Sequence, residues 1–101
     1  MIEEETIQTV WNKGAIPIPE EAAHWRQDPC GAWIARSQYG RRDSEYGWEI
    51  DRLDPDGDDS PANLQPLQWE NHVAKRGGQP HCVVTAHGAR NIKPSEADPS
   101  R

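Results

Sequence analysis

Carboxylate and imidazole side chains are the types that suit chemistry on a phosphate, and Asp51 and His72 are one such pair in this chain. A carboxylate oxygen and an imidazole nitrogen form a ligand pair that suits Mg²⁺, Mn²⁺ or a transition-metal ion. Taken one at a time, neither residue is specific, because a strand-end aspartate is usually a solvated carboxylate and a lone helix histidine is usually a surface residue. Their meaning therefore depends on the elements that bring them together.

The segment 47–53 has the composition and alternation of a strand. Its two faces would hold Trp48, Ile50 and Arg52 on one side and Glu49, Asp51 and Leu53 on the other. Residues 54–61 are dense in turn formers and predict a loop. Residues 63–75 are predicted to form a helix, or a turn leading into one, that stops at the glycine pair 77–78. Asp51 and His72 would then come from a strand and from the helix that follows it.

The other predicted elements are short. A helix is expected at 3–12, because Ile7, Val10 and Trp11 recur at helical spacing. The remaining expected segments are an extended connector at 16–19, a helical turn at 20–27, a strand at 31–39, a closing strand at 82–86 and a flexible tail at 91–101. The predicted fold class is α+β, with a single domain over 1–90 and a ββα core at about 31–77.

The composition is that of a small polar protein with a folded core. The chain has 101 residues, which fits one domain, and its mean hydropathy is −1.00. Five tryptophans spread along the chain argue against disorder, because each one can bury a large apolar area. The net charge of −6 is unlike that of a plain nucleic-acid binder. It leaves room for a metal-dependent nuclease, whose carboxylates gather around the cation.

The sequence predicts neither membrane insertion nor secretion. No apolar run approaches the roughly 20 residues that a membrane-spanning helix needs. The N-terminal stretch MIEEE has three acidic residues and no apolar core, so it does not read as a signal peptide. A cytoplasmic location is therefore expected.

The two cysteines, Cys30 and Cys82, are far apart in the sequence. Two cysteines cannot form a four-cysteine zinc knuckle. The favoured interpretation is a pair of reduced, half-buried thiols. A structural metal shared with a histidine such as His81 and a disulfide are the two alternatives.

The stretch GWEIDRLDPDGDDSPANLQPLQWENHVAKRGG, residues 47–78, carries the strongest pattern in the chain. It resembles the HNH endonucleases, also called His-Me finger or ββα-metal nucleases, in their small stand-alone form. The shared features are GWEID, the proline and glycine of the loop, NLQPL followed by QW, and NH followed by lysine. Upstream CGAWI and YG are similar as well, so the resemblance covers roughly residues 10 to 90.

The resemblance implies a chemical role for each matching position. Members of the family cleave DNA phosphodiesters with one divalent ion, here Mg²⁺, Mn²⁺, Ni²⁺ or Zn²⁺. Asp51 and His72 match the metal ligands. Asn63 matches the residue that orients the general base through a hydrogen bond. The resemblance also implies a prokaryotic or phage origin.

Arg52 is the departure from the family pattern, because it stands at the catalytic position where the general-base histidine belongs. Arginine stays protonated, so it cannot take a proton from water, although its planar fork can bind phosphate. Three accounts are open. The chain is a natural degenerate relative, or it carries a substitution that silences a toxic nuclease, or a histidine among His24, His81 and His87 reaches the site.

Four basic residues, Arg41, Arg42, Lys75 and Arg76, are candidates for a phosphate-binding track. The competing interpretation is solvated surface charge. The leading hypothesis is an HNH-type nuclease with activity weakened or lost through Arg52. The rival is a non-catalytic decoy on the same scaffold, whose acidic surface would imitate nucleic acid or meet a basic protein partner.

Overall fold

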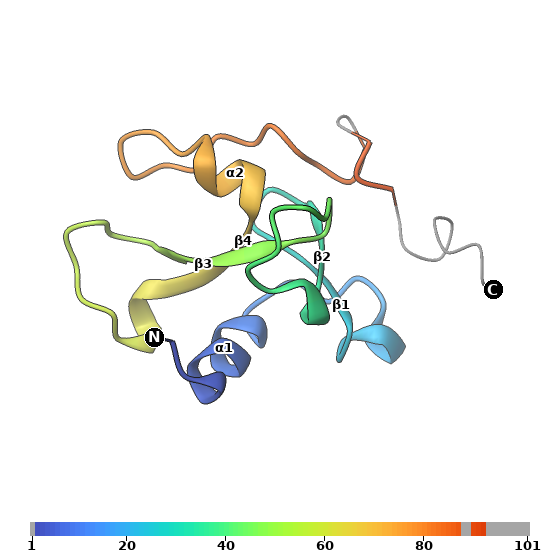
Figure 1. The fold of residues 1–101 in the computed structure, drawn as a ribbon, viewed down its shortest axis with the longest axis horizontal. Helices are drawn as coiled ribbons and strands as arrows, with labels where there is room; N and C mark the ends of the chain where they lie inside the picture. Colours follow the sequence, from blue (N-terminus) through green and yellow to red (C-terminus); the bar gives the residue numbers. More distant parts are fainter. Residues whose placement is uncertain (1, 88–89, 93–101) are drawn as a thin grey trace.

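The computed structural model describes residues 2–87 and 90–92. In chain order its elements are α1 (Glu4–Trp11), the 3₁₀ turn η1 (Pro19–Glu21), β1 (Trp25–Gln27), β2 (Trp33–Ala35), the 3₁₀ turn η2 (Arg36–Gln38), β3 (Trp48–Arg52), the 3₁₀ turn η3 (Pro61–Asn63), β4 (Leu64–Gln68) and α2 (Trp69–Val73). The sheet of β3 and β4 lies between α1 and α2 (Figure 1). The predicted α+β class is confirmed at this level.

β3 and β4 pair antiparallel, from Trp48 opposite Gln68 to Arg52 opposite Leu64. The strand predicted at 47–53 is confirmed as β3. The helix predicted at 63–75 is wrong in its first half, where the chain forms β4, and helical structure is confined to the five residues of α2. The antiparallel strands β3 and β4 are therefore followed directly by the helix α2.

Pro66 explains why this stretch is extended. A proline inside a helix removes a backbone hydrogen bond and costs about 3 kcal/mol. An antiparallel strand, in contrast, has alternate positions whose N–H points away from the partner strand. Pro66 takes such a position opposite Ile50, because the register is fixed by a 2.8 Å bond from the Leu53 N–H to the Asn63 carbonyl.

The core forms where α1 packs against β3 and β4. The helix predicted at 3–12 is confirmed as α1, and its three predicted apolar residues are buried. The core cluster consists of Ile7, Val10, Trp11, Ile34, Trp48 and Leu64. The rings of Trp11 and Trp48 lie 5.3 Å apart between centroids, and Tyr39 packs edge-on against Trp48 at 4.9 Å. These contacts fix the position of β3, which carries Asp51.

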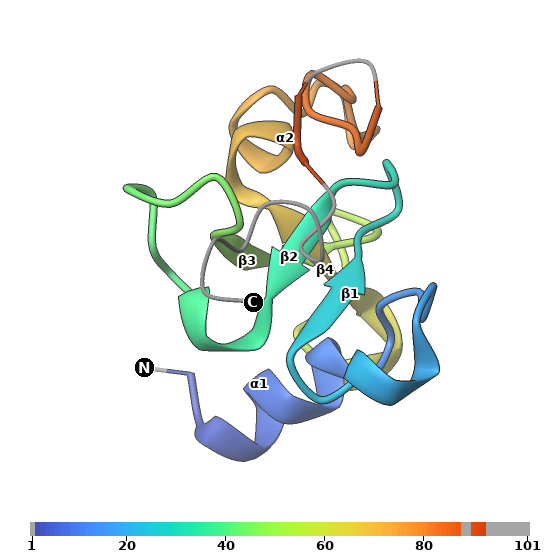
Figure 2. The same cartoon turned by 90° about the vertical axis from the view of Figure 1, so that its right-hand side faces the viewer.

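The second sheet is a hairpin of β1 and β2, side by side in Figure 2. The helical turn predicted at 20–27 is confined to η1, and its last three residues form β1 instead. The strand predicted at 31–39 shortens to β2 and continues as η2. The turn at 28–31 explains why β1 forms and why β2 begins late, because its last residue Gly31 has φ of +81° and its N–H donates to the Asp28 carbonyl. This turn closes a hairpin rather than ending a helix.

Cys30 and Cys82 form a disulfide, with their Cα atoms 5.4 Å apart. The predicted reduced thiols are therefore wrong, and so is the alternative of a metal shared with His81. The bridge forms because the 28–31 turn meets the segment that follows α2, where the Ala86 N–H donates to the Gly31 carbonyl at 3.1 Å. Nothing in the cysteine spacing indicates this approach.

Asp28 is a buried carboxylate that joins this turn to β4 and α2, and it is only 3% exposed. One oxygen accepts the backbone N–H groups of residues 30 and 32, and the other accepts the Gln68 N–H at 2.9 Å and the Asn71 amide at 3.2 Å. Burial raises the pKa of Asp28, and these hydrogen bonds oppose that rise. The cluster positions the start of α2.

The segment after α2 is irregular, so the closing strand predicted at 82–86 is wrong. A side chain holds part of its backbone, because the Asn71 side chain accepts the N–H of Val84 and donates to its carbonyl. Asn91, at the start of the predicted tail, is 1% exposed and donates to the Glu45 carbonyl at 3.3 Å. The rest of the predicted tail, 93–101, lies outside the described residues.

Candidate metal and phosphodiester site

Asp51 and His72 come together across the contact between β3 and α2. The distance from Asp51 Oδ1 to His72 Nε2 is 3.6 Å. Asp51 is 2% exposed on β3, and the His72 side chain is 32% exposed on α2. The structure thus places an oxygen and a nitrogen donor next to each other at the edge of the core, with the nitrogen on a histidine side chain that is partly exposed.

Glu49 orients the His72 ring. His72 Nδ1 lies 2.7 Å from Glu49 Oε1, and because a carboxylate only accepts, Nδ1 must carry the proton of this bond. In the neutral ring Nε2 is then left with its lone pair on the side of Asp51. Arg42 holds Glu49 in turn through two bonds of 2.6 and 2.9 Å. Chiefly through this Arg42 pairing, the pKa of Glu49 is lowered.

Both oxygens of Asp51 have protein partners. Oδ2 accepts the Gln65 side-chain amide at 2.9 Å, across the β3–β4 pair. Oδ1 accepts the Lys75 ammonium at 2.7 Å. The same ammonium donates to the backbone carbonyl of Arg52 at 2.6 Å. A buried carboxylate is therefore held between an amide on β4 and a cation that follows α2.

The donor pair can be tested against the geometry of a divalent ion. Two ligands that each lie about 2.1 Å from one ion stand roughly 3.0 to 3.4 Å apart at octahedral or tetrahedral angles. The observed 3.6 Å between Asp51 and His72 is within a few tenths of that range. Within the part of the chain that the structure describes, no group of three or more His, Cys, Asp or Glu side chains is arranged for a metal. An ion held by this pair alone would leave most of its positions to water and phosphate.

Arg52 does not point between these two side chains. Its Nε donates to Asp59 Oδ1 at 2.7 Å, and its Nη1 lies 3.4 Å from the Pro55 carbonyl. Arg52 therefore ties the end of β3 to the following loop, while its guanidinium stays on the rim of the site.

The site has two adjoining cavities. One, of about 450 Å³, is lined by Ile50, Asp51, Arg52, Pro55, His72, Lys75 and Gly78. The other, of about 580 Å³, shares Ile50, Arg52 and His72 with the first and extends toward Tyr39 and the start of α1. His24, His81 and His87, which all lie in the described part of the chain, line neither cavity. The structure thus brings no replacement histidine to position 52.

Asn63 lies at the end of η3 and clamps the loop after β3 instead of capping a helix. Its Oδ1 accepts the Asp54 N–H at 2.9 Å, and its Nδ2 donates to the carbonyls of Asp54 and Asp58 at 3.0 and 2.8 Å. A Cβ atom at Gly57 would lie 2.7 Å from Asn63 Nδ2, so the loop needs glycine there. Asn63 therefore orients the backbone of this loop and does not bind the Arg52 side chain.

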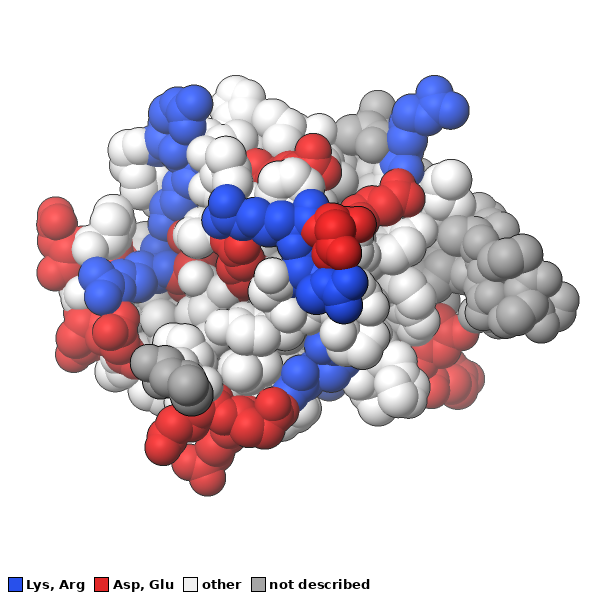
Figure 3. Space-filling view, viewed as in Figure 1, with Lys and Arg blue, Asp and Glu red and all other residues white. Residues whose placement is uncertain are grey.

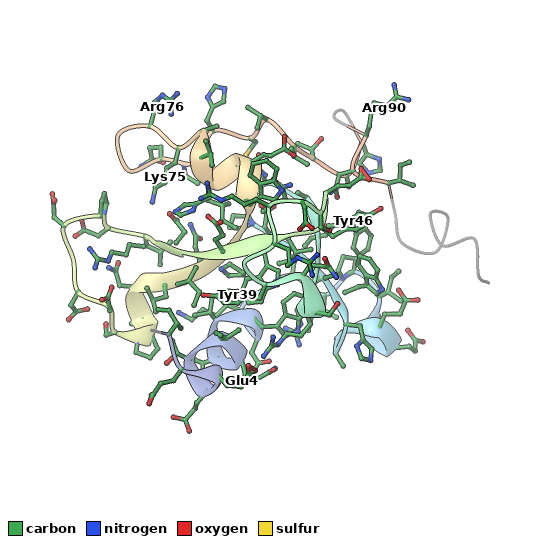
Figure 4. The ribbon with its side chains drawn as sticks, in the orientation of Figure 1. Glu4, Tyr39, Tyr46, Lys75, Arg76 and Arg90 are labelled. Atoms are coloured by element: carbon green, nitrogen blue, oxygen red, sulfur yellow. A yellow bond between two sulfur atoms is a disulfide. The ribbon has the colours of Figure 1, made fainter. Side chains whose placement is uncertain are left out.

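The four candidate phosphate-binding residues have different surroundings. Arg41 pairs with Asp43 and Arg42 with Glu49, while the Arg76 guanidinium donates to the backbone carbonyls of Val73 and Lys75. Basic side chains cross the viewed face above β3 and near α2, and acidic ones gather along α1 and the loop after β3 (Figure 3). Lys75 and Arg76 stand at the end of α2, and Lys75 lies on the side of β3 (Figure 4).

Sequence reasoning missed two residues of the site. Glu49 has a usable signal, because strand alternation puts it on the same face as Asp51. Gln65 has none, because a helix prediction over its segment hides the cross-strand pair that it forms with Asp51. The contact of Lys75 with Asp51 also depends on how α2 packs on the sheet.

Comparisons of the chain with protein-family models, with curated proteins and with solved structures found no match in any of the three. Among the described residues, no helix combines the length and the apolar character that crossing a membrane requires. Only the geometry of the site therefore bears on the function of the chain.

Proposed function

We propose that β3, β4 and α2 form a ββα-metal unit of the HNH type, which binds one divalent ion and a DNA phosphodiester. The observation that carries the proposal is the 3.6 Å approach of Asp51 Oδ1 and His72 Nε2, with the histidine ring oriented by Glu49. A carboxylate behind a ligating histidine is the arrangement that strengthens imidazole as a ligand. The candidate ions are Mg²⁺, Mn²⁺, Ni²⁺ and Zn²⁺.

The ion would supply charge stabilisation at the reacting phosphate and at the leaving oxygen. The chain supplies the ligands Asp51 and His72, and Asn63 keeps the neighbouring loop in shape. The cavity of about 580 Å³ beside the pair gives room for the nucleoside on one side of the phosphate. Arg52 lines both cavities, and its guanidinium can donate hydrogen bonds to a phosphate oxygen.

Turnover is expected to be impaired, because an arginine stands at the position of the general base and His24, His81 and His87 do not line the site. Arg52 is a permanent cation and pairs with Asp59. A missing general base commonly lowers the rate by about 10²- to 10⁴-fold. The site therefore supports binding of an ion and a phosphodiester more strongly than it supports hydrolysis.

Nicking of supercoiled plasmid with each of the four ions tests this proposal. The wild-type protein should nick slowly or not at all, and Arg52→His should nick at least about a hundredfold faster. Asp51→Asn placed on the Arg52→His background is the control and should abolish the gain. Nicking that survives this second change would contradict the assignment of Asp51, and an inactive Arg52→His protein would contradict the missing-base account.

A second candidate is a non-catalytic decoy or protein-binding domain, favoured by the net charge of −6 and the acidic edge along α1 and the loop after β3. Such a protein would bind a basic protein partner and would not require Asp51 or His72. Arg52→His separates the two candidates, because a decoy gains no nuclease activity from a restored histidine.

A further inference from the structure

We infer that Lys75 is an internal cation that occupies the metal position on Asp51, so that a divalent ion binds only by displacing the lysine ammonium. The inference rests on the metal pair proposed above and adds a regulator of that same pair. It makes Lys75 a positioning residue whose ammonium and the divalent ion exclude each other.

The geometry around Asp51 leaves one oxygen for both cations. Oδ2 is directed to Gln65 on β4, so Oδ1 is the atom that faces His72. The Lys75 ammonium sits on this same Oδ1 at 2.7 Å. An ion between Asp51 and His72 would bind the same oxygen as the ammonium, and two positive charges that close to one oxygen atom would repel each other.

Burial explains why the ammonium is there. Asp51 is 2% exposed and the Lys75 side chain 13% exposed, and a carboxylate that leaves water needs a nearby positive charge. The Arg52 carbonyl accepts a second bond from the ammonium and fixes its position. Lys75 therefore stabilises the protein without metal and weakens the binding of metal to it.

The cavity beside Asp51 gives the displaced Lys75 ammonium a place to go. Lys75 also lines the cavity of about 450 Å³, together with Arg52. A lysine ammonium sits on a flexible four-carbon stem, so after release it can turn into this cavity without a change in the backbone. There it would meet a phosphate oxygen, and ion binding would thereby provide a cation for the phosphodiester.

Mn²⁺ affinity of Lys75→Met tests the inference, measured by titration with electron paramagnetic resonance of the free ion. The variant should bind Mn²⁺ about tenfold to a hundredfold more tightly than wild type, the range set by one hydrogen bond to a charged group. Arg76→Met is the matched control, because it removes the neighbouring positive charge but no contact to Asp51. It should change the affinity by less than about threefold.

Each outcome decides a different point. An unchanged or weaker Mn²⁺ affinity in Lys75→Met overturns the inference. An equal gain in affinity in Arg76→Met also overturns it, because any nearby positive charge would then have the same effect. In either case Asp51→Asn shows whether the metal pair stands, because loss of binding in that variant keeps the proposed function. Absence of binding in both wild type and Lys75→Met overturns the inference and the metal site together.

A measurement on the wild-type protein covers the case in which Lys75→Met fails to fold. The ammonium nitrogen of Lys75 can be followed by NMR while diamagnetic Mg²⁺ is added. The inference predicts that this ammonium signal shifts and loses its protection from solvent as the site fills. An unchanged Lys75 ammonium signal while the His72 ring signals shift would contradict the inference.

Discussion

At the scale of single residues, the site is a chain of oriented side chains. Arg42 holds Glu49, Glu49 holds the His72 ring, and His72 faces Asp51. The resemblance to HNH nucleases supplied Asp51, His72 and Asn63 from sequence, and strand alternation could have added Glu49. The place of Lys75 on Asp51 could not be predicted, because a lysine at a helix end is equally suited to solvent and to a buried partner.

Glu49→Gln is expected to lower Mn²⁺ affinity by about tenfold, because a neutral amide orients the His72 ring but strengthens its basicity less. Calorimetric titration of the variant and of wild type measures the difference. Asp43→Asn is the matched control, because it removes one acidic partner of an arginine on the same face without touching His72. Equal effects of the two changes would show that only surface charge matters.

At the scale of elements, the unit that carries the site is β3, β4 and α2. Sequence reasoning placed β3 correctly and extended the following helix too far toward the N-terminus. The error came from apolar residues at 64 and 67 that fit a helix period, whereas Pro66 and the pairing with β3 favour a strand. Pairing between distant strands is a tertiary effect, so local periodicity does not reveal it.

Asn63→Ala should loosen the loop after β3 and lower the free energy of unfolding by about 1 to 2 kcal/mol. The variant loses three hydrogen bonds to the backbone of residues 54 and 58. Urea denaturation gives the stability, and amide hydrogen exchange of residues 53–59 gives the local effect. Gly57→Ala should loosen the same loop, because its Cβ would press on Asn63. Global destabilisation without faster exchange in this loop would argue against the clamp.

At the scale of the whole molecule, three distant segments are held together by the disulfide and by Asp28. The disulfide was only an alternative to reduced thiols and the contacts of Asp28 were not predicted, because contacts across 52 residues of sequence depend on the complete fold. The bridge also bears on the predicted cytoplasmic location, since disulfides persist mainly in oxidising compartments. That location stays a prediction.

Reduction of the disulfide is expected to destabilise the protein by about 4 kcal/mol in the chain-entropy model for a loop of this length. The bridge joins Cys30 to Cys82, so opening it frees the segment that packs on α2. Thermal unfolding with and without reductant measures the effect, and Cys30→Ser with Cys82→Ser should reproduce it. A thermal midpoint that ignores reductant would contradict a structural role for the bridge.

The raised pKa of Asp28 predicts a sign for the pH dependence of stability. A carboxyl group whose pKa is higher in the folded than in the unfolded protein contributes most to stability below its unfolded pKa of about 3.9. This contribution to the free energy of unfolding falls as pH rises through the folded pKa. The free energy of unfolding of the wild type minus that of Asp28→Asn should therefore fall as pH rises from 3 to 7. Urea denaturation of both proteins at several pH values measures this difference. If the wild type instead gains stability relative to the variant as pH rises, the pKa of Asp28 is lowered.

The central claim is that Asp51 and His72 hold one divalent ion. A crystal of the wild-type protein soaked in Mn²⁺ tests it most directly through the anomalous difference map. The account predicts one peak within about 2.3 Å of Asp51 Oδ1 and His72 Nε2, with the Lys75 ammonium moved away from the carboxylate. A map with Mn²⁺ bound elsewhere, or with no peak at this pair and Lys75 still on Asp51, would contradict the claim.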